Sequence, residues 1–320
     1  MTPTPCRLSF FALAFASVAC SGSSSGTTPA SGAQDPAAAL DTAVDALAGD
    51  LCPVFAQCSP PFVKIYVGDD LELCKKEEAT TLRAGLHQPG VLATAADIDA
   101  CRTALLAGGC DVIFKYVQGN DLPAPCRAPG SLADGAGCAY HLQCQSAHCD
   151  RPTPAACGTC AARRAAGAAC TDDAQCENGL VCGNDGACIK PGGRGEACDD
   201  KHPCFGWLGC HDGTCGDPLA EGQPCKNLTS DCDLYGKGLV CVANACTALS
   251  FVAPGEDCGI IGGKAAACSG GACAPSMLKG TCVGYADVGQ ACDTVLGPTC
   301  GLHGDCIDKT CVSLFAQTCK

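Results

Sequence analysis

The sequence has few aromatic residues, almost no methionine and little positive charge. Of its 320 residues, one is tryptophan, five are tyrosine, nine are phenylalanine and two are methionine. So few large side chains argue against one hydrophobic core that extends through the whole chain. Small units that lack a large core need stabilising cross-links such as disulfides, because each unit buries too little apolar surface to fold alone.

The scarcity of basic residues argues against a nucleic-acid partner. Lys and Arg together number 20, against 33 Asp and Glu, and the formal net charge is −13. Binding to nucleic acid requires a basic patch or stripe. The acidic pairs Asp172-Asp173 and Asp199-Asp200 are interpreted as solvated surface, because no Asp-x-Asp-x-Asp-Gly calcium loop surrounds them.

Cysteine is the residue that the sequence has in abundance, with 34 copies. A content above about 8–10% is typical of a disulfide scaffold. Reducing compartments keep thiols reduced, so a cytosolic location would require metal clusters instead. We therefore predict an exported protein in which most cysteines are paired.

The first twenty residues predict export. Arg7 precedes the apolar run Leu8 to Ala19, which is far shorter than the ~20 residues of a membrane span and has the layout of a signal peptide. The run ends in Ser17-Val18-Ala19-Cys20. This ending resembles a bacterial lipoprotein signal, in which the cysteine is acylated and becomes the new N-terminus.

Cysteine parity favours acylation of Cys20 over ordinary cleavage, which the Ser-Val-Ala sequence would also permit. Of the 34 cysteines, removing Cys6 with the signal and acylating Cys20 leaves 32, whereas cleavage after Ala19 alone leaves 33. Ser21 resembles the outer-membrane sorting choice. We predict an outer-membrane lipoprotein attached through Cys20, at the cell surface or facing the periplasm. Without acylation the protein would be secreted.

Composition divides the chain after the signal. Residues 21–36 contain no large apolar residue and are predicted to form a flexible Ser/Gly-rich tether. Residues 37–127 contain three segments with helical spacing of apolar residues: Ala38–Leu51, Asp69–Leu86 and Ala95–Ala107. Gly108-Gly109 is predicted to end the last of these.

Residues 37–127 are therefore predicted to form a short disulfide-stapled α-helical domain. Its pairing is left open, because spacing alone does not decide among the possibilities. The six cysteines involved are Cys52, Cys58, Cys74, Cys101, Cys110 and Cys126.

Residues 128–320 repeat one pattern six times. Each copy opens with a glycine three residues before a cysteine, and the openings lie 27 to 34 residues apart. This period is typical of small repeat units. The openings are Gly135/Cys138, Gly167/Cys170, Gly195/Cys198, Gly222/Cys225, Gly255/Cys258 and Gly289/Cys292.

Each copy also holds two closely spaced cysteines around turn-forming residues such as Asn184-Asp185-Gly186. Asn, Asp and Gly favour tight hairpin turns, so each pair is predicted to lie on the two arms of a β-hairpin. In the first and fifth copies the pair is second and third among the cysteines, which predicts two types of unit. The pairs are Cys144/Cys149, Cys182/Cys188, Cys210/Cys215, Cys241/Cys246, Cys268/Cys273 and Cys306/Cys311.

Opposite positions on a hairpin share one face, so both sulfurs of a pair point toward the earlier cysteines of the copy. For the second copy this favours Cys170–Cys182 and Cys176–Cys188, although spacing does not exclude other pairings. Five cysteines in each of the first and sixth copies require bridges that cross copy boundaries. Partners are left open for Cys138, Cys144, Cys149, Cys157, Cys198, Cys204, Cys210 and Cys215.

The stretch from Cys170 to Cys182, CTDDAQCENGLVC, resembles the N-terminal cysteine-rich motif of Dickkopf proteins. The whole layout is similar to myxobacterial-type lipoproteins that carry such repeats behind a helical cysteine-containing domain. The resemblance implies a surface array of disulfide-rich modules, and it does not imply Wnt antagonism.

The sequence offers weak signals for metal or redox chemistry, and we predict no metal and no cofactor. Cys157-Gly-Thr-Cys160 has the spacing of a redox pair or half a zinc site, but no βαβ context surrounds it. It is interpreted as two ordinary half-cystines. Four histidines flank cysteines without a recurring Cys2His2 spacing: His141, His148, His202 and His211.

Trp207, between Cys204 and Cys210, is the only tryptophan. It is either an exposed contact residue or a ring packed on a disulfide. No Ser/His/Asp set, phosphate loop or carboxylate pair can be singled out. Residues 37–127 contain a single histidine, His87, which argues against a hydrolase in that region.

These observations predict a non-enzymatic cell-surface lipoprotein. Its repeats would form a quasi-one-dimensional array that serves as a stalk or as a binding surface for an unknown protein or glycan. The alternative is an extracellular protease inhibitor or secreted protein ligand, with Leu234–Val240 and Gly259–Ala267 as candidate reactive loops.

Overall fold

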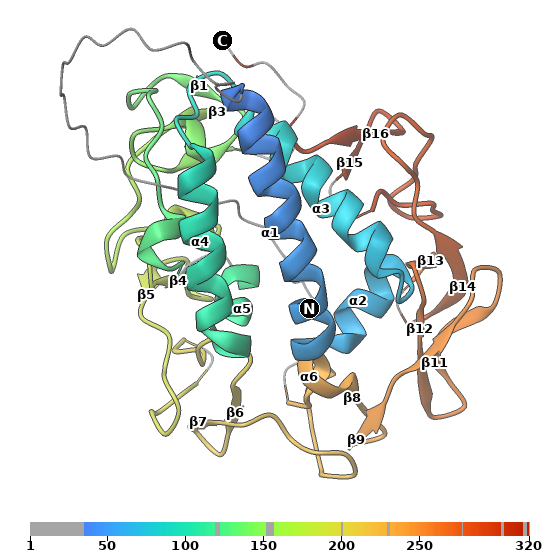
Figure 1. The fold of residues 1–320 in the computed structure, drawn as a ribbon. Coiled ribbons are helices and arrows are strands. Elements are labelled where there is room, and N and C mark those ends of the chain that lie inside the picture. The colour runs from blue at the N-terminus through green and yellow to red at the C-terminus, as the bar shows by residue number, and fades with distance from the viewer. Residues whose placement is uncertain are drawn as a thin grey trace, which may run out of the picture.

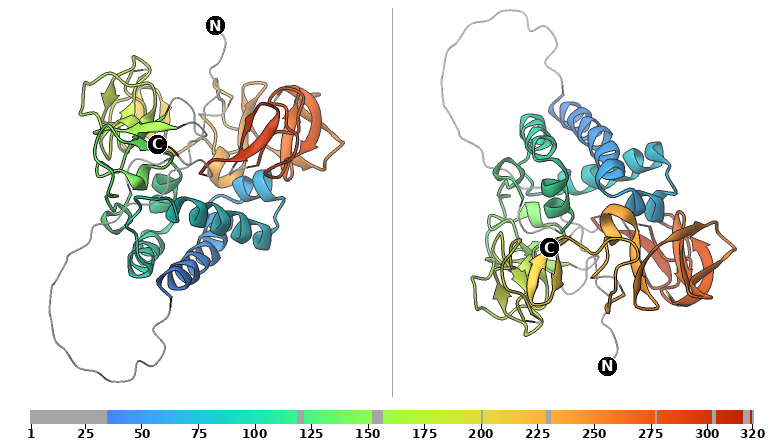
Figure 2. Two further views of the ribbon diagram at one scale, coloured as in Figure 1. Left: turned by 90° about the horizontal axis from the view of Figure 1, so that it is seen from above. Right: turned by 90° about the horizontal axis from the view of Figure 1, so that it is seen from below.

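The computed structural model describes residues 35–118, 122–151, 157–199, 201–228, 231–276, 278–301, 304–315 and 319. The helices form one layer, and the cysteine-rich segments follow its left, lower and right edges in Figure 1. Figure 2 shows that these segments lie mostly on one side of the helical layer. Among the described helices, none combines the length and apolar character that crossing a membrane requires. The helices of the N-terminal region are α1 (Pro36–Cys58), α2 (Pro60–Val67), α3 (Leu71–Leu86), α4 (Ala95–Ala107) and α5 (Gly109–Gln118).

Capping residues fix where these helices begin. Asp35 accepts a hydrogen bond from the backbone N–H of Ala37 at the start of α1, and Pro36 occupies a first-turn position where its missing N–H costs nothing. Thr94 and Asp97 form a capping box at the start of α4. This helix spans the predicted residues.

Two helices of the N-terminal region, α2 and α5, were not predicted, and the predicted end of α4 marks the start of another helix. Gly108 ends α4, but α5 begins at Gly109, so the glycine pair is a bend between helices. α2 begins with Pro60-Pro61, which resembles a helix breaker in the sequence although proline is favoured at the first helical position. α1 continues past Leu51 to Cys58 because its apolar stripe continues.

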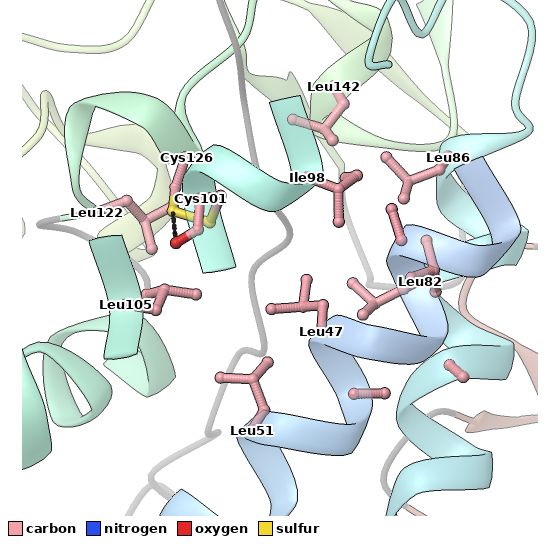
Figure 3. Close-up of a cluster of buried hydrophobic side chains, with 14 of the residues drawn as sticks. Leu47, Leu51, Leu82, Leu86, Ile98, Cys101, Leu105, Leu122, Cys126 and Leu142 are labelled. Carbon is pink, nitrogen blue, oxygen red and sulfur yellow. Dashed lines mark hydrogen bonds between the residues drawn. A yellow bond between two sulfur atoms is a disulfide. The ribbon is translucent and has the colours of Figure 1, made fainter. Parts of the chain in front are cut away.

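The helical core lies between α1, α3 and α4, with Leu47, Leu51, Leu82, Leu86 and Ile98 in contact (Figure 3). Three disulfides reinforce it, and each joins elements that lie apart in the sequence. They are Cys52–Cys74, Cys58–Cys110 and Cys101–Cys126.

We number the cysteine-rich segments one (128–160), two (161–190), three (191–217), four (218–249), five (250–284) and six (285–319). Their strands are short and mostly antiparallel. Segments one to three contain β1 (Gly137–Cys138), β2 (Cys149–Asp150), β3 (Gly158–Cys160), β4 (Val181–Cys182), β5 (Cys188–Ile189), β6 (Gly209–His211) and β7 (Thr214–Gly216). Segments four to six contain α6 (Leu234–Lys237), β8 (Leu239–Val242), β9 (Ala245–Ala248), β10 (Ser250–Val252), β11 (Asp257–Ile261), β12 (Lys264–Cys268), β13 (Gly271–Ala274), β14 (Lys279–Gly284), β15 (Gly304–Ile307) and β16 (Thr310–Ser313).

In every segment the third and fourth cysteines of the shared pattern lie directly opposite each other on paired antiparallel strands. The opposed residues are Cys149/Cys160, Cys182/Cys188, Cys210/Cys215, Cys241/Cys246, Cys273/Cys282 and Cys306/Cys311. The predicted hairpin pairs of segments one and five, Cys144/Cys149 and Cys268/Cys273, are therefore wrong. Close spacing misled there because the hairpin that follows the third cysteine has a longer connection. All six segments share one arrangement instead of two.

The disulfides of each segment join the first cysteine to the third and the second to the fourth. Segment two has Cys170–Cys182 and Cys176–Cys188, the pairing that the spacing favoured. The other segments have Cys138–Cys149, Cys144–Cys160, Cys198–Cys210, Cys204–Cys215, Cys225–Cys241, Cys232–Cys246, Cys258–Cys273, Cys268–Cys282, Cys292–Cys306 and Cys300–Cys311. The extra cysteines of segments one and six bond to each other as Cys157–Cys319, which joins the two ends of the cysteine-rich part.

The opening glycine has a structural reason that the sequence did not reveal. In segment two, the N–H of Gly167 donates to the carbonyl of Cys188 at 2.8 Å, and the N–H of Cys188 donates to the carbonyl of Ala168 at 2.8 Å. The glycine has a φ of 84°, which residues with a Cβ rarely adopt. The same two hydrogen bonds recur in the other segments from Gly135, Gly195, Gly222, Gly255 and Gly289, all with positive φ.

The segments do not form a free-standing stalk, because segments one and three to six pack against the helices. Tyr140 and Leu142 of segment one and Phe315 of segment six belong to the helical core. Trp207 of segment three lies against Phe114 of α5, with ring centroids 5.0 Å apart. The helical layer therefore organises the cysteine-rich part.

Segments four, five and six also contact the helices. The Ser59 hydroxyl donates to the carbonyl of Tyr235 at 2.7 Å. The Lys64 ammonium lies 5.2 Å from the ring centroid of Phe251. Tyr285 stacks on Tyr66, with centroids 6.1 Å apart and ring planes 12° from parallel.

Candidate functional site

A cleft of about 710 Å³ lies between α2 and α3 on one side and segments five and six on the other. Its volume is within the range of small-molecule sites, about 300–1,000 Å³. The helical wall is mostly apolar and includes Phe55, Phe62, Val63 and Leu73, with charged side chains from α3 at one part of it. Ligand sites commonly combine such a wall with a few polar groups that orient the ligand.

The acidic side chains of the cleft come mainly from α3. Glu78 lines the cleft and is only 5% exposed, whereas its neighbour Glu77 is half-buried. Burial, and to a smaller extent repulsion from Glu77, raise the pKa of the Glu78 carboxyl to about 7. A small ligand could therefore change the charge of this group near neutral pH.

The opposite wall consists largely of small residues, so backbone lines much of it. Segments five and six contribute Ala253, Gly270, Gly284, Ala286 and Gly304. Wall positions without bulky side chains leave room for a ligand and allow close approach to the main chain.

Two tyrosines join the walls. Tyr66 of α2 stacks on Tyr285, which begins segment six, and both line the cleft. Burial raises the pKa of Tyr66 to about 12 and also raises the pKa of Tyr285. Both phenols are therefore neutral at physiological pH.

The cleft is held in shape by covalent and backbone links. Cys74, in its lining, is bonded to Cys52 of α1. The N–H of Gly270 donates to the carbonyl of Lys64 at 3.0 Å, which fixes segment five to α2. A site held in this way needs little reorganisation to bind.

Trp207 lies beside a second, smaller hollow of about 460 Å³ that Asp111, Lys190 and Arg194 also line. The indole is half-buried and packs on Phe114. The indole therefore packs against a phenylalanine of α5, and this contact within the chain accounts for its position.

His141 and His148 are buried and stacked, with ring centroids 5.3 Å apart. Burial lowers the pKa of His141 and, with Arg163 nearby, lowers the pKa of His148 to about 4. The N–H of Cys149 donates to His141 Nδ1 at 3.0 Å. Because arginine side chains lie nearby, the two imidazoles are expected to be neutral, and a bound metal cation would be repelled.

The other chemistry-bearing residues take structural roles. Asp199 lies 2.9 Å from His202 Nδ1, and His211 Nε2 lies 3.1 Å from the carbonyl of Asp217. The clustered cysteine sulfurs are members of disulfides. Cys157 and Cys160 bond to Cys319 and Cys144, as two half-cystines do and a redox pair does not.

Neither candidate reactive loop is an extended loop. Leu234–Val240 contains α6 and the start of β8, where Val240 is buried. Gly259–Ala267 falls on the paired strands β11 and β12.

The most exposed apolar pair lies elsewhere, in a loop between Cys292 and Cys300. Val295 is 60% exposed and Leu296 is 67% exposed. Asp293 Oδ1 accepts from both of their N–H groups at 2.8 Å, which orders the loop. The sequence feature that marks this loop is an Asp two residues before an aliphatic pair that Gly-Pro follows.

The extensive disulfides indicate an exported or extracellular protein. The predicted acylation site, Cys20, and all but the last two residues of the tether lie outside the described residues. No family model, no curated protein and no solved structure matches the chain.

Proposed function

We propose that this protein is a non-enzymatic binding lipoprotein, attached to the outer membrane through an acylated Cys20, whose cleft between α2–α3 and segments five and six holds the ligand. The apolar run that ends at Cys20 and the Ser/Gly-rich tether support the attachment. The disulfides support a location outside the cytoplasm.

We also propose that the six segments are copies of one Dickkopf-like repeat. The common disulfide order, the opposed third and fourth cysteines and the glycine hydrogen bonds support this. Here the repeats act as a brace around the helices, since segments one and three to six contact them. Two of the copies form one wall of the cleft.

The cleft is the observation that carries the binding function. The buried residue Glu78 lines it, and it lies between a mostly apolar helical wall and segments that contribute many small residues. These are the features by which a binding site differs from an ordinary surface hollow.

Filling the cleft is expected to abolish ligand binding. A Cβ added at Gly284 meets nothing nearer than the carbonyl of Gly270 at 4.0 Å, so Gly284→Phe places a ring in the cleft without a backbone clash. A thermal-shift screen of small molecules against the full chain should give stabilising ligands, and the variant should lose these shifts. Gly216→Phe is the matched control, because a Cβ there meets nothing nearer than the ring of His211 at 4.0 Å and the residue lines neither the cleft nor the hollow beside Trp207. Ligands whose shifts survive in Gly284→Phe bind elsewhere and would refute the assignment.

Replacing the acylated cysteine is expected to release the protein from the membrane. A Cys20→Ser chain cannot be acylated, so fractionation of the producing cells should move it from the membrane to the soluble or secreted fraction. Ser21→Ala leaves the acylation site intact and should keep the protein in the membrane fraction. Recovery of Cys20→Ser from membranes in unchanged amount would contradict the anchor.

A further inference from the structure

The charged groups that line the cleft are mostly acidic. Glu77 and Glu78 come from α3 and Asp287 from segment six, whereas Lys76 is the one basic residue among the described lining residues. Glu78 is 5% exposed, so water screens its carboxyl poorly. A positive ligand group therefore gains more there than at an exposed carboxylate.

The surfaces beside these carboxyl groups are aromatic and aliphatic. Phe62 is buried, and its ring centroid lies 4.5 Å from that of Tyr66. Leu73 is 37% exposed and lines the same cleft. Aromatic faces attract cations, and apolar surface favours a ligand body of the same kind.

We propose that the cleft binds a small organic cation, with a protonated amine or guanidinium group against Glu78 and an apolar body against Phe62 and Leu73. The proposal rests on the binding function above and specifies the chemical class of the ligand. A charge-assisted hydrogen bond to a carboxylate is stronger than one between neutral groups. An anion would instead face three acidic side chains.

Binding of such a cation competes with protonation of Glu78. The pKa of this carboxyl is about 7, so it is ionised at pH 8 and mostly protonated at pH 5.5. The titratable groups that line the cleft with Glu78 are Lys76 and Glu77 on its own helix, Tyr66 on α2, and Tyr285 and Asp287 in segment six. The lining residue that α1 contributes, Phe55, is uncharged. Binding is expected to weaken by between about tenfold and 30-fold from pH 8 to pH 5.5, because the ionised fraction falls about 30-fold and the protonated form retains at most the affinity of a neutral ligand.

Three probes of nearly equal size test the charge requirement. Phenethylamine, phenethyl alcohol and phenylacetate carry a positive, neutral and negative group on the same aromatic body, and calorimetric titration of the full chain at pH 8 gives their affinities. We expect the amine to bind at least about tenfold more tightly than the alcohol. Phenylacetate should bind most weakly.

Glu78→Gln is expected to remove the preference for the amine, because the amide has a similar shape but no charge. The amine and the alcohol should then differ by about twofold or less, and the pH dependence should disappear. Glu221→Gln, an exposed position in segment four, should leave both properties unchanged. If Glu78→Gln does not fold, the pH profile of the unaltered chain with the three probes decides.

The outcomes separate the two proposals. Equal binding of amine and alcohol, or a preference that survives in Glu78→Gln, would overturn the cation inference while leaving a binding cleft. Failure of all three probes to bind, together with no cleft-dependent ligand in the thermal-shift screen, would overturn both.

Discussion

A variant with serine in place of both Cys157 and Cys319 is expected to lose about 2–4 kcal/mol of unfolding free energy. This disulfide joins residues 162 apart, far more than any other bridge described. The chain-entropy relation gives about 5 kcal/mol for a loop of that length. The bridges inside the loop already restrict the unfolded chain, so the expected loss is smaller.

The loss should affect the whole body, because this bridge holds the end of segment six against segment one. Phe315, four residues before Cys319, contacts Tyr140 in the core. Urea unfolding followed by tyrosine fluorescence and circular dichroism measures the change. Both signals should shift together to lower urea concentration.

A second double variant provides the comparison. Serine at Cys170 and Cys182 removes a bridge between residues only 12 apart in segment two. It is expected to loosen that segment while leaving the main transition closer to that of the unaltered chain. An unchanged midpoint for the Cys157/Cys319 variant would contradict a role for this bridge in closing the structure.

Local signals made part of the fold predictable. α4 has a capping box at Thr94 and a glycine after Ala107, so both of its ends can be read from the sequence. Opposed cysteines on a short hairpin likewise favoured the pairing that segment two has, although spacing did not exclude the others. The predictions for segments one and five were wrong because the two most closely spaced cysteines there do not lie on the two arms of the hairpin.

The wrapping of the segments around the helices depends on contacts that no local pattern contains. The few aromatic residues of the cysteine-rich part are used mainly for this purpose. Six of them contact helical residues or enter the helical core: Tyr140, Trp207, Tyr235, Phe251, Tyr285 and Phe315. The scarcity of aromatics argued against one hydrophobic core through the whole chain, and it left open that these few rings would join a core shared with the helices.

The cleft could not be predicted for the same reason. Glu78 belongs to the run Lys75-Lys76-Glu77-Glu78, which has the composition of a solvated helix face. It is buried in the fold and lines a cleft whose other wall, segments five and six, follows some 170 to 230 residues later in the sequence. Tyr66 and Tyr285, which also line the cleft and stack on each other, are likewise far apart in the sequence.

Replacing Tyr140 by alanine is expected to cost about 3–5 kcal/mol of unfolding free energy, as is usual for loss of a buried aromatic ring. Tyr140 is 1% exposed and is the largest of the fully buried side chains described. Its ring meets Phe315 edge-on, with centroids 4.7 Å apart. A Cβ on Gly85 of α3 would lie only 2.7 Å from the ring, so the absence of a side chain there leaves it room.

Replacing Tyr140 by phenylalanine distinguishes the contribution of the ring to stability from that of the hydroxyl. The Tyr140 hydroxyl is buried and has no hydrogen-bond partner within the described part of the chain. Removing a buried polar group without a partner costs nothing and can stabilise by about 1 kcal/mol. Tyr140→Phe should therefore unfold in urea at the same concentration as the unaltered chain or slightly above it, whereas Tyr140→Ala should unfold well below it. If the phenylalanine variant loses as much stability as the alanine variant, the ring is not what joins segment one to the helices.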